Sequence, residues 1–132
     1  MKEIDSDTYA ALQDFMRRMS EDSHLIIDDV ILYGSRARGD HKSESDVDVA
    51  VILMDDGADK ERIRKIRYEL IDYAYNTMLA LFTKDVSLRI HPLPIPKPHW
   101  DNPSIFQNPH LIQNIQKEGI SMMSIYERLS EN

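Results

Sequence analysis

The sequence predicts a small mixed α/β (α+β) domain, in which helices flank a sheet. The chain has 132 residues, the size of one ordinary domain with its own buried core. Apolar residues recur at helical and strand spacings in turn, in the order helix, strand, strand, helix, strand, helix. There is no cysteine, which excludes a disulfide scaffold, a zinc ribbon and a thiol nucleophile. We therefore expect residues 1–132 to form a single domain.

The first half of the chain predicts one helix and two strands. The apolar positions of the helix recur at steps of three and four: Tyr9, Leu12, Phe15, Met16 and Met19. Asp5, Ser6 or Asp7 can cap it, because a short side-chain oxygen accepts a free backbone N–H. Residues 30–33 are rich in β-formers and end at Gly34, which indicates a buried strand. Residues 46–53 begin as a polar–apolar alternation and end as an apolar run, which indicates a strand with one polar and one buried end.

The second half predicts a long helix, a third strand and a closing helix. Residues 59–81 have helical spacing and a basic stretch over 60–67, which we interpret as a solvated face, with docking to a partner as the alternative. Residues 85–90 alternate as in a strand. The proline-rich segment 91–103 is expected to run extended over the surface, because proline cannot donate to a sheet. A last helix over about 109–118 starts with Pro109 and ends at Gly119.

Aromatic and histidine side chains outside this pattern receive plain structural interpretations. Tyr68, Tyr73 and Tyr75 on the long helix are expected to pack against other elements. Trp100 is expected to pin the proline-rich segment to the core, with a partner contact as the alternative. The histidines show no metal-ligand spacing and are expected at the surface: His24, His91, His99 and His110.

Charge and hydropathy exclude several classes of partner. Sixteen Lys and Arg against 23 Asp and Glu give a net charge of −7, which argues against stable DNA or RNA binding, since that affinity comes from neutralised phosphates. The longest apolar run, residues 49–54, is far short of the ~20 residues that span a bilayer. Residues 1–5 lack the apolar core of a signal peptide. We therefore expect a cytoplasmic protein with no membrane partner.

The residues that indicate chemistry lie between the first two strands. Gly34 follows a strand and has no side chain, so the backbone can come close to a ligand. The backbone N–H groups of a turn at this point can bind phosphate, and Ser35 adds a hydroxyl to them. Asp46 and Asp48 lie two apart on a strand, so both carboxylates project from one face and repel unless a cation such as Mg²⁺ neutralises them. Asp85 begins the next predicted strand. A third acid there would match a two-metal site for in-line phosphoryl displacement.

The spacing of these residues resembles a known motif. Gly34-Ser35, ten further residues and then Asp46-Val47-Asp48 resemble the motif of the DNA polymerase beta-like nucleotidyltransferase superfamily. By size, the chain is most similar to the minimal nucleotidyltransferase (MNT) group, whose best-known members are MntA-type antitoxins paired with HEPN-domain toxins. The resemblance covers residues 25–90, and residues 111–119 also resemble the short closing helix of such proteins. It implies the polymerase beta-like nucleotidyltransferase fold.

The resemblance also implies roles for single residues. Gly34 and Ser35 would hold a nucleoside triphosphate, ATP, and Asp46 and Asp48 would ligate two Mg²⁺ ions. Asp85 would be the third catalytic acid and metal ligand, which activates the acceptor hydroxyl.

Three neighbouring side chains leave alternatives open. Ser87 shares the face of Asp85 on the predicted strand, and a serine in the third-acid position would leave the catalytic set incomplete. Arg36 and Arg38 can contact the triphosphate, or they can be ordinary exposed loop residues.

The leading hypothesis is a Mg²⁺-dependent nucleotidyltransferase that moves AMP from ATP to a hydroxyl. The small chain leaves almost no residues for an acceptor-binding domain, and its acidity does not suit a large RNA. The resemblance therefore favours a protein acceptor, a tyrosine of a cognate HEPN-domain toxin, with this chain as the antitoxin. One alternative is a catalytically weak or inactive antitoxin that neutralises its partner by binding. Another is transfer to a small molecule of the aminoglycoside type.

Overall fold

The computed structural model describes residues 4–22 and 24–130, so part of the segment on which the signal-peptide expectation rests lies outside the described residues. The elements follow in the order α1 (Ser6–Ser20), β1 (Ile27–Tyr33), α2 (Ser35–Arg38), β2 (Val47–Leu53), α3 (Lys60–Phe82), β3 (Ile90–Pro96), α4 (Lys97–Asp101), the 3-10 helix η1 (Pro103–Ile105), α5 (Pro109–Glu118), β4 (Ile120–Ser121) and α6 (Met123–Ser130). Of the candidate caps for α1, Asp5 is the N-cap, and its Oδ1 accepts the N–H of Thr8 at 2.7 Å.

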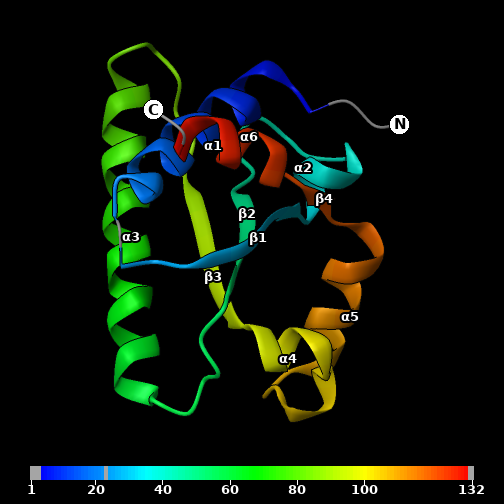
Figure 1. Ribbon diagram of the computed structural model, residues 1–132. Coiled ribbons are helices and arrows are strands. Elements are labelled where there is room, and N and C mark those ends of the chain that lie inside the picture. Colours follow the sequence, from blue (N-terminus) through cyan, green and yellow to red (C-terminus); the bar gives the residue numbers. More distant parts are fainter. Residues whose placement is uncertain (1–3, 23, 131–132) are drawn as a thin grey trace.

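One mixed sheet organises the fold (Figure 1). Its strands lie in the order β3-β2-β1-β4. Strand β1 is antiparallel to both β2 and β4, whereas β2 and β3 are parallel. The mixed sheet and its flanking helices confirm the predicted fold class.

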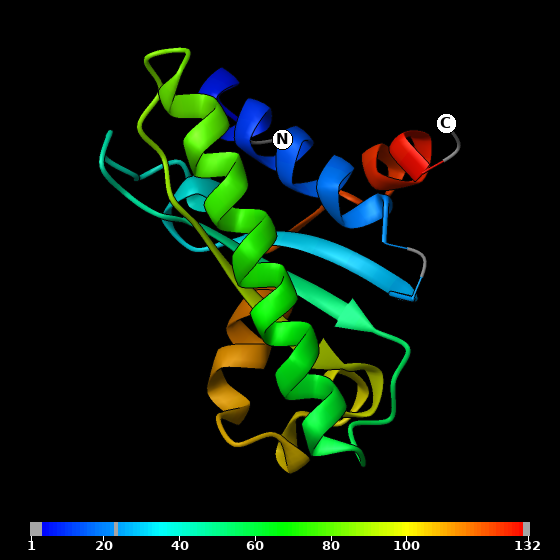
Figure 2. The same ribbon diagram turned by 90° about the vertical axis from the view of Figure 1, so that its left-hand side faces the viewer.

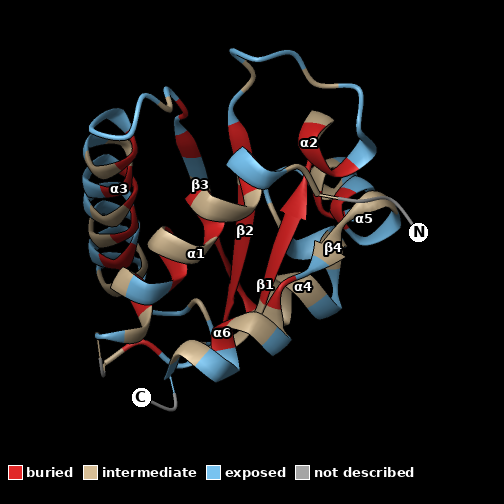
Figure 3. Cartoon of the chain, turned by 90° about the horizontal axis from the view of Figure 1, so that it is seen from above, coloured by how far each residue is buried: buried red, intermediate tan, exposed pale blue. Residues whose placement is uncertain are grey.

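Each face of the sheet has its own hydrophobic core. On the first face, Val47, Val49 and Val51 of β2 pack with buried residues of α1, α3 and α6. On the second face, Ala50 and Ile52 pack with α5 and with partly buried residues of α4. Side chains of a strand alternate between faces, so the odd and even positions of β2 serve different layers. Figure 3 shows that β1 and β2 are buried for most of their length. Trp100 packs against the second core, as expected.

The prediction for the third strand is wrong in position. Residues 86–89 are not a strand, and the first half of the proline-rich segment forms β3, followed by the short helix α4. The N–H of Val47 donates to the carbonyl of Arg89 at 2.9 Å, so the odd residues of this segment point their backbone groups at β2. The prolines of β3 all fall at even positions, where the backbone faces the free edge and needs no donor: Pro92, Pro94 and Pro96.

The helices agree better with prediction. Helix α3 lies within one residue of the expected range, and α5 has the expected bounds, with Pro109 in its first turn and Gly119 after its end. The short elements β4 and α6 were not predicted. The packing expected for the tyrosines of α3 is correct for Tyr73, whose hydroxyl donates to Asp22, but wrong for Tyr68 and Tyr75, which are more than half exposed. Within the described ranges, no helix is long and apolar enough to cross a membrane.

Candidate active site

The junction of β1 and α2 lies directly against β2. Gly34 follows β1 with a φ of +76°, and a Cβ atom built on it would lie 2.4 Å from Oδ2 of Asp48. Only glycine adopts this backbone conformation without strain and leaves room for the carboxylate. Ser35 begins α2, and its carbonyl accepts the N–H groups of Gly39 and Asp40 at 2.9 and 3.2 Å. The sequence motif is therefore a contact in space between Gly34 and Asp48.

Asp48 is the centre of the site. In the sheet it lies between Tyr33 of β1 and His91 of β3, and it projects from the second face. Burial is the largest cause that raises the pKa of Asp48, and the charge of Asp46 raises it further. His91 and Arg38 act in the opposite direction. Burial and the charge of Asp48 also raise the pKa of Tyr33 to about 12.

The pair Asp46 and Asp48 fits a divalent cation. Asp46 is exposed in the loop just before β2, while Asp48 is half-buried. The mutual repulsion that raises the pKa of Asp48 is relieved by a cation, and carboxylate oxygens are the ligands that Mg²⁺ prefers. The donor set present therefore fits the metal that the sequence motif implies.

The two arginines of α2 have different environments. Arg38 is exposed; its Nε donates to Asp40 and its Nη1 to Glu118 at the end of α5, each at 3.1 Å. Its charge lowers the pKa of Asp48, so Arg38 lies near the site, with its guanidinium paired to two acids.

Arg36 is buried and acts within the fold. Its Nε donates to the carbonyl of Ser45 at 2.9 Å, and its Nη1 donates to Thr8 Oγ1 at 2.8 Å. Its Nη2 donates to the carbonyls of Lys42 and Ser43. The guanidinium therefore ties the loop before Asp46 to α1, and its donors are used in the fold instead of on a nucleotide.

The residue of β3 beside Asp48 is a histidine, whereas the sequence predicted an acid there. The residue paired with Asp48 across β3 is His91, and its Nδ1 lies 3.5 Å from Oδ1 of Asp48. Asp85 lies in the turn after α3 with a φ of +60°. With Ser87 it lines a separate cavity of about 310 Å³. Because β3 starts at Ile90, the structure places neither Asp85 nor Ser87 on the strand beside Asp48. His91 is exposed, as expected, and the alternating prolines that follow it are the signal that would have placed it on β3.

A second group of ionisable residues lies near the opposite end of β1. His24 Nε2 is 2.6 Å from Glu69 Oε2 and 3.4 Å from Asp22 Oδ2. One ligand atom from each of these three residues lies within 4.8 Å of the others. The histidines show no metal-ligand spacing in the sequence, and this group forms only in space, because Glu69 is 45 residues from His24.

Comparison with known proteins agrees with the motif. The model of the nucleotidyltransferase domain family matches residues 12–120, so the chain belongs to that family. A crystal structure from Sulfolobus solfataricus, of a protein provisionally assigned as a nucleotidyltransferase, aligns with a TM-score of 0.40 and 12% identity. The alignment covers 92% of this chain and 89% of that chain. No curated protein sequence matches the chain.

Proposed function

We propose that this chain uses a divalent cation, Mg²⁺, to transfer AMP from ATP to a hydroxyl group of another protein. The acceptor is a tyrosine of a cognate HEPN-domain toxin, which makes this chain the antitoxin. Family membership supports the general chemistry of nucleotidyl transfer. The contact of Gly34 with Asp48, beside Asp46 and Arg38, supports the parts of the proposal that concern the cation and the triphosphate, and the choice of acceptor rests on the resemblance of the sequence motif.

Each residue of the site has a part in such a reaction. Asp46 and Asp48 would hold the cation, which would neutralise charge on the phosphates and on the two carboxylates. Gly34 and Ser35 cradle the triphosphate, and Arg38 offers a guanidinium to it. The hydroxyl oxygen bonds to the α-phosphorus, and the bond from that phosphorus to the bridging oxygen breaks, so pyrophosphate leaves. We assign His91 the removal of the hydroxyl proton, because its Nδ1 lies 3.5 Å from Oδ1 of Asp48 and histidine is the most common general base.

A second candidate is an antitoxin that works by binding alone. The specific observation in its favour is that His91, and not the predicted acid Asp85, lies beside Asp48 on β3. Two carboxylates still hold a cation there, but a metal set with only two acids binds it more weakly.

One experiment separates the two candidates. The chain is incubated with ATP, Mg²⁺ and the HEPN-domain product of the neighbouring gene, and the masses of both proteins are measured. The proposal expects one AMP group on the partner with the native chain and none with the D46N/D48N double variant. No mass increase under conditions where the two proteins bind each other contradicts the transfer. If the double variant still neutralises the partner at full strength, binding is the function.

A further inference from the structure

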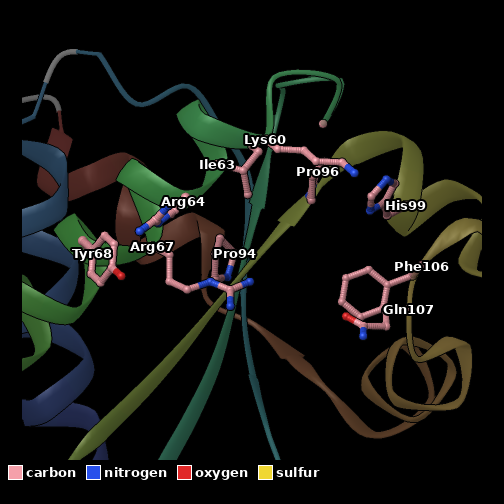
Figure 4. Close-up of a pocket in the computed structure, with 11 residues that line it drawn as sticks. Lys60, Ile63, Arg64, Arg67, Tyr68, Pro94, Pro96, His99, Phe106 and Gln107 are labelled. Carbon is pink, nitrogen blue, oxygen red and sulfur yellow. The ribbon is translucent and has the colours of Figure 1, made fainter.

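Two cavities follow each other along the outer side of the sheet, between α3 and β3. The larger, about 550 Å³, is lined by Gly57, Lys60, Ile63, Arg64, Arg67, Tyr68, Pro94, Pro96, His99, Phe106 and Gln107 (Figure 4). The second, about 400 Å³, is lined by Ile71, Ala74, Tyr75, Met78, Arg89, Ile90, His91 and Pro92. Since their lining residues are consecutive on both elements, we treat them as one α3–β3 groove. It runs along α3, which spans the height of the molecule in Figure 2.

The lining of the groove differs in charge from the chain as a whole. The chain has 23 Asp and Glu, yet among the described residues no Asp or Glu lines either cavity. Lys60 and Arg67 are exposed and make no ion pair within the described ranges. In the part of the chain that the structure describes, the ion pair of Arg64 is with Glu61, at 3.7 Å with both side chains exposed, and its guanidinium lies over the Tyr68 ring. One end of the groove therefore presents three cations to solvent.

The other end of the groove reaches the candidate active site. His91 lines the second cavity, and its ring lies beside Asp48. From His91 to Pro96 the strand advances about 17 Å, the length of five or six residues of an extended peptide. A ligand that fills the groove can therefore have one group at His91 and another among the cations.

The middle of the groove is apolar. There it is lined by Ile71, Ala74 and Pro92, whereas Arg89, the cation of the second cavity, lies two residues before His91 and belongs to that end. A nucleic acid carries a phosphate at every nucleotide and needs cations along its path, so this pattern fits it poorly. The prolines of β3 have no N–H on the free edge, so a ligand cannot add as a further strand and must be bound through side chains.

We propose that the α3–β3 groove binds the acceptor protein as an extended segment. The hydroxyl residue lies at His91, apolar side chains fill the middle, and Asp or Glu side chains pair with Lys60, Arg64 and Arg67. This inference rests on the proposed transfer to a protein, and it adds the chemical class of the segment that is recognised.

The test selects peptides without ATP, so that it is independent of transfer. A pool of octapeptides with one fixed tyrosine and randomised flanks is passed over the immobilised full chain. We expect enrichment of Asp and Glu roughly three to five residues from the tyrosine. Selected peptides without acidic enrichment would overturn the proposal, and so would an octanucleotide of single-stranded RNA that binds more tightly than the selected peptides.

Charge-reversed variants locate the binding. The K60E/R67E double variant should weaken binding of a selected peptide at least about tenfold, because two attractions become repulsions. Lys65→Glu is the matched control: Lys65 is exposed on the same helix but lines neither cavity, and its change should stay within about twofold. The K60A/R67A variant removes the two charges without adding acids. Circular dichroism spectra recorded beside the binding measurements show whether each variant is folded.

The outcomes separate this inference from the proposed function. Equal losses with Lys65→Glu and with the double variant would overturn the groove as the binding site. If acidic peptides bind but no AMP is transferred to the HEPN-domain partner, the groove remains a peptide-binding site and the proposed transfer is wrong. If K60E/R67E leaves the transfer unchanged, the proposed transfer stands and the groove is not where the acceptor binds.

Discussion

Replacing Gly34 by alanine should disturb the fold and the site together. The backbone at Gly34, with φ +76° and ψ −158°, belongs to a region that only glycine occupies freely. Strain of this kind costs about 2 kcal/mol, which corresponds to a fall of roughly 6–10 °C in Tm for a domain of this size. The new Cβ would also meet Asp48 Oδ2 at 2.4 Å, so the carboxylate has to move. Binding of a divalent cation should weaken with it.

The chain offers a matched control in Gly39. Its φ is +84°, but a Cβ there meets nothing within 4 Å. Gly39→Ala should cost about 1 kcal/mol of stability through strain alone and leave cation binding unchanged. Thermal unfolding by circular dichroism measures the first effect, and calorimetric titration with Mn²⁺ or Mg²⁺ measures the second. The reasoning is refuted if Gly34→Ala binds the cation as the native chain does, or if Gly39→Ala loses binding equally.

Three further changes test the other parts of the site. Arg36→Ala removes the buried guanidinium that ties the loop before Asp46 to α1, so the free energy of unfolding in a urea titration should fall by about 3 kcal/mol; a fall no larger than that of the exposed variant Arg38→Ala would contradict this role. Because the folded-state pKa of Asp48 is raised, its ionised form opposes folding, and stability is lost as the pH rises from about 4 through the raised pKa. Asp48→Asn should therefore raise Tm at pH 7, with a gain that vanishes near pH 4, and a gain that does not depend on pH would count against it. Mg²⁺ should raise the Tm of the native chain, and the same addition to D46N/D48N should leave it unchanged; equal shifts would place the ion elsewhere.

Elements whose signals are local were predicted well. Helices α3 and α5 have apolar stripes, and α5 also has Pro109 and Gly119 at its two ends, so no distant residue is needed to place it. The spacing of the motif that contains Gly34 and Asp48 indicated that the two residues belong to one site, and the structure brings them into contact.

Features that depend on the fold as a whole were missed. An edge strand tolerates a proline whose nitrogen faces away from the neighbouring strand. Which residues of β3 face away from β2 is known only once β3 is placed beside β2. Because the strand begins at Ile90 and not at Asp85, the residue beside Asp48 is His91 and not Asp85. Arg36 is buried because α1, 28 residues earlier, closes over it, and no local pattern distinguishes it from the exposed Arg38.

The alternating prolines of β3 also determine which residues of this strand can be followed by amide hydrogen–deuterium exchange. Proline carries no amide hydrogen, so Pro92, Pro94 and Pro96 are silent in hydrogen–deuterium exchange. The amides of Leu93 and Ile95 lie on the side that pairs with β2. Their exchange therefore measures only the separation of β3 from β2, without a background from the free edge. A slowing of these two amides on peptide binding would show that the ligand holds the strand in the sheet.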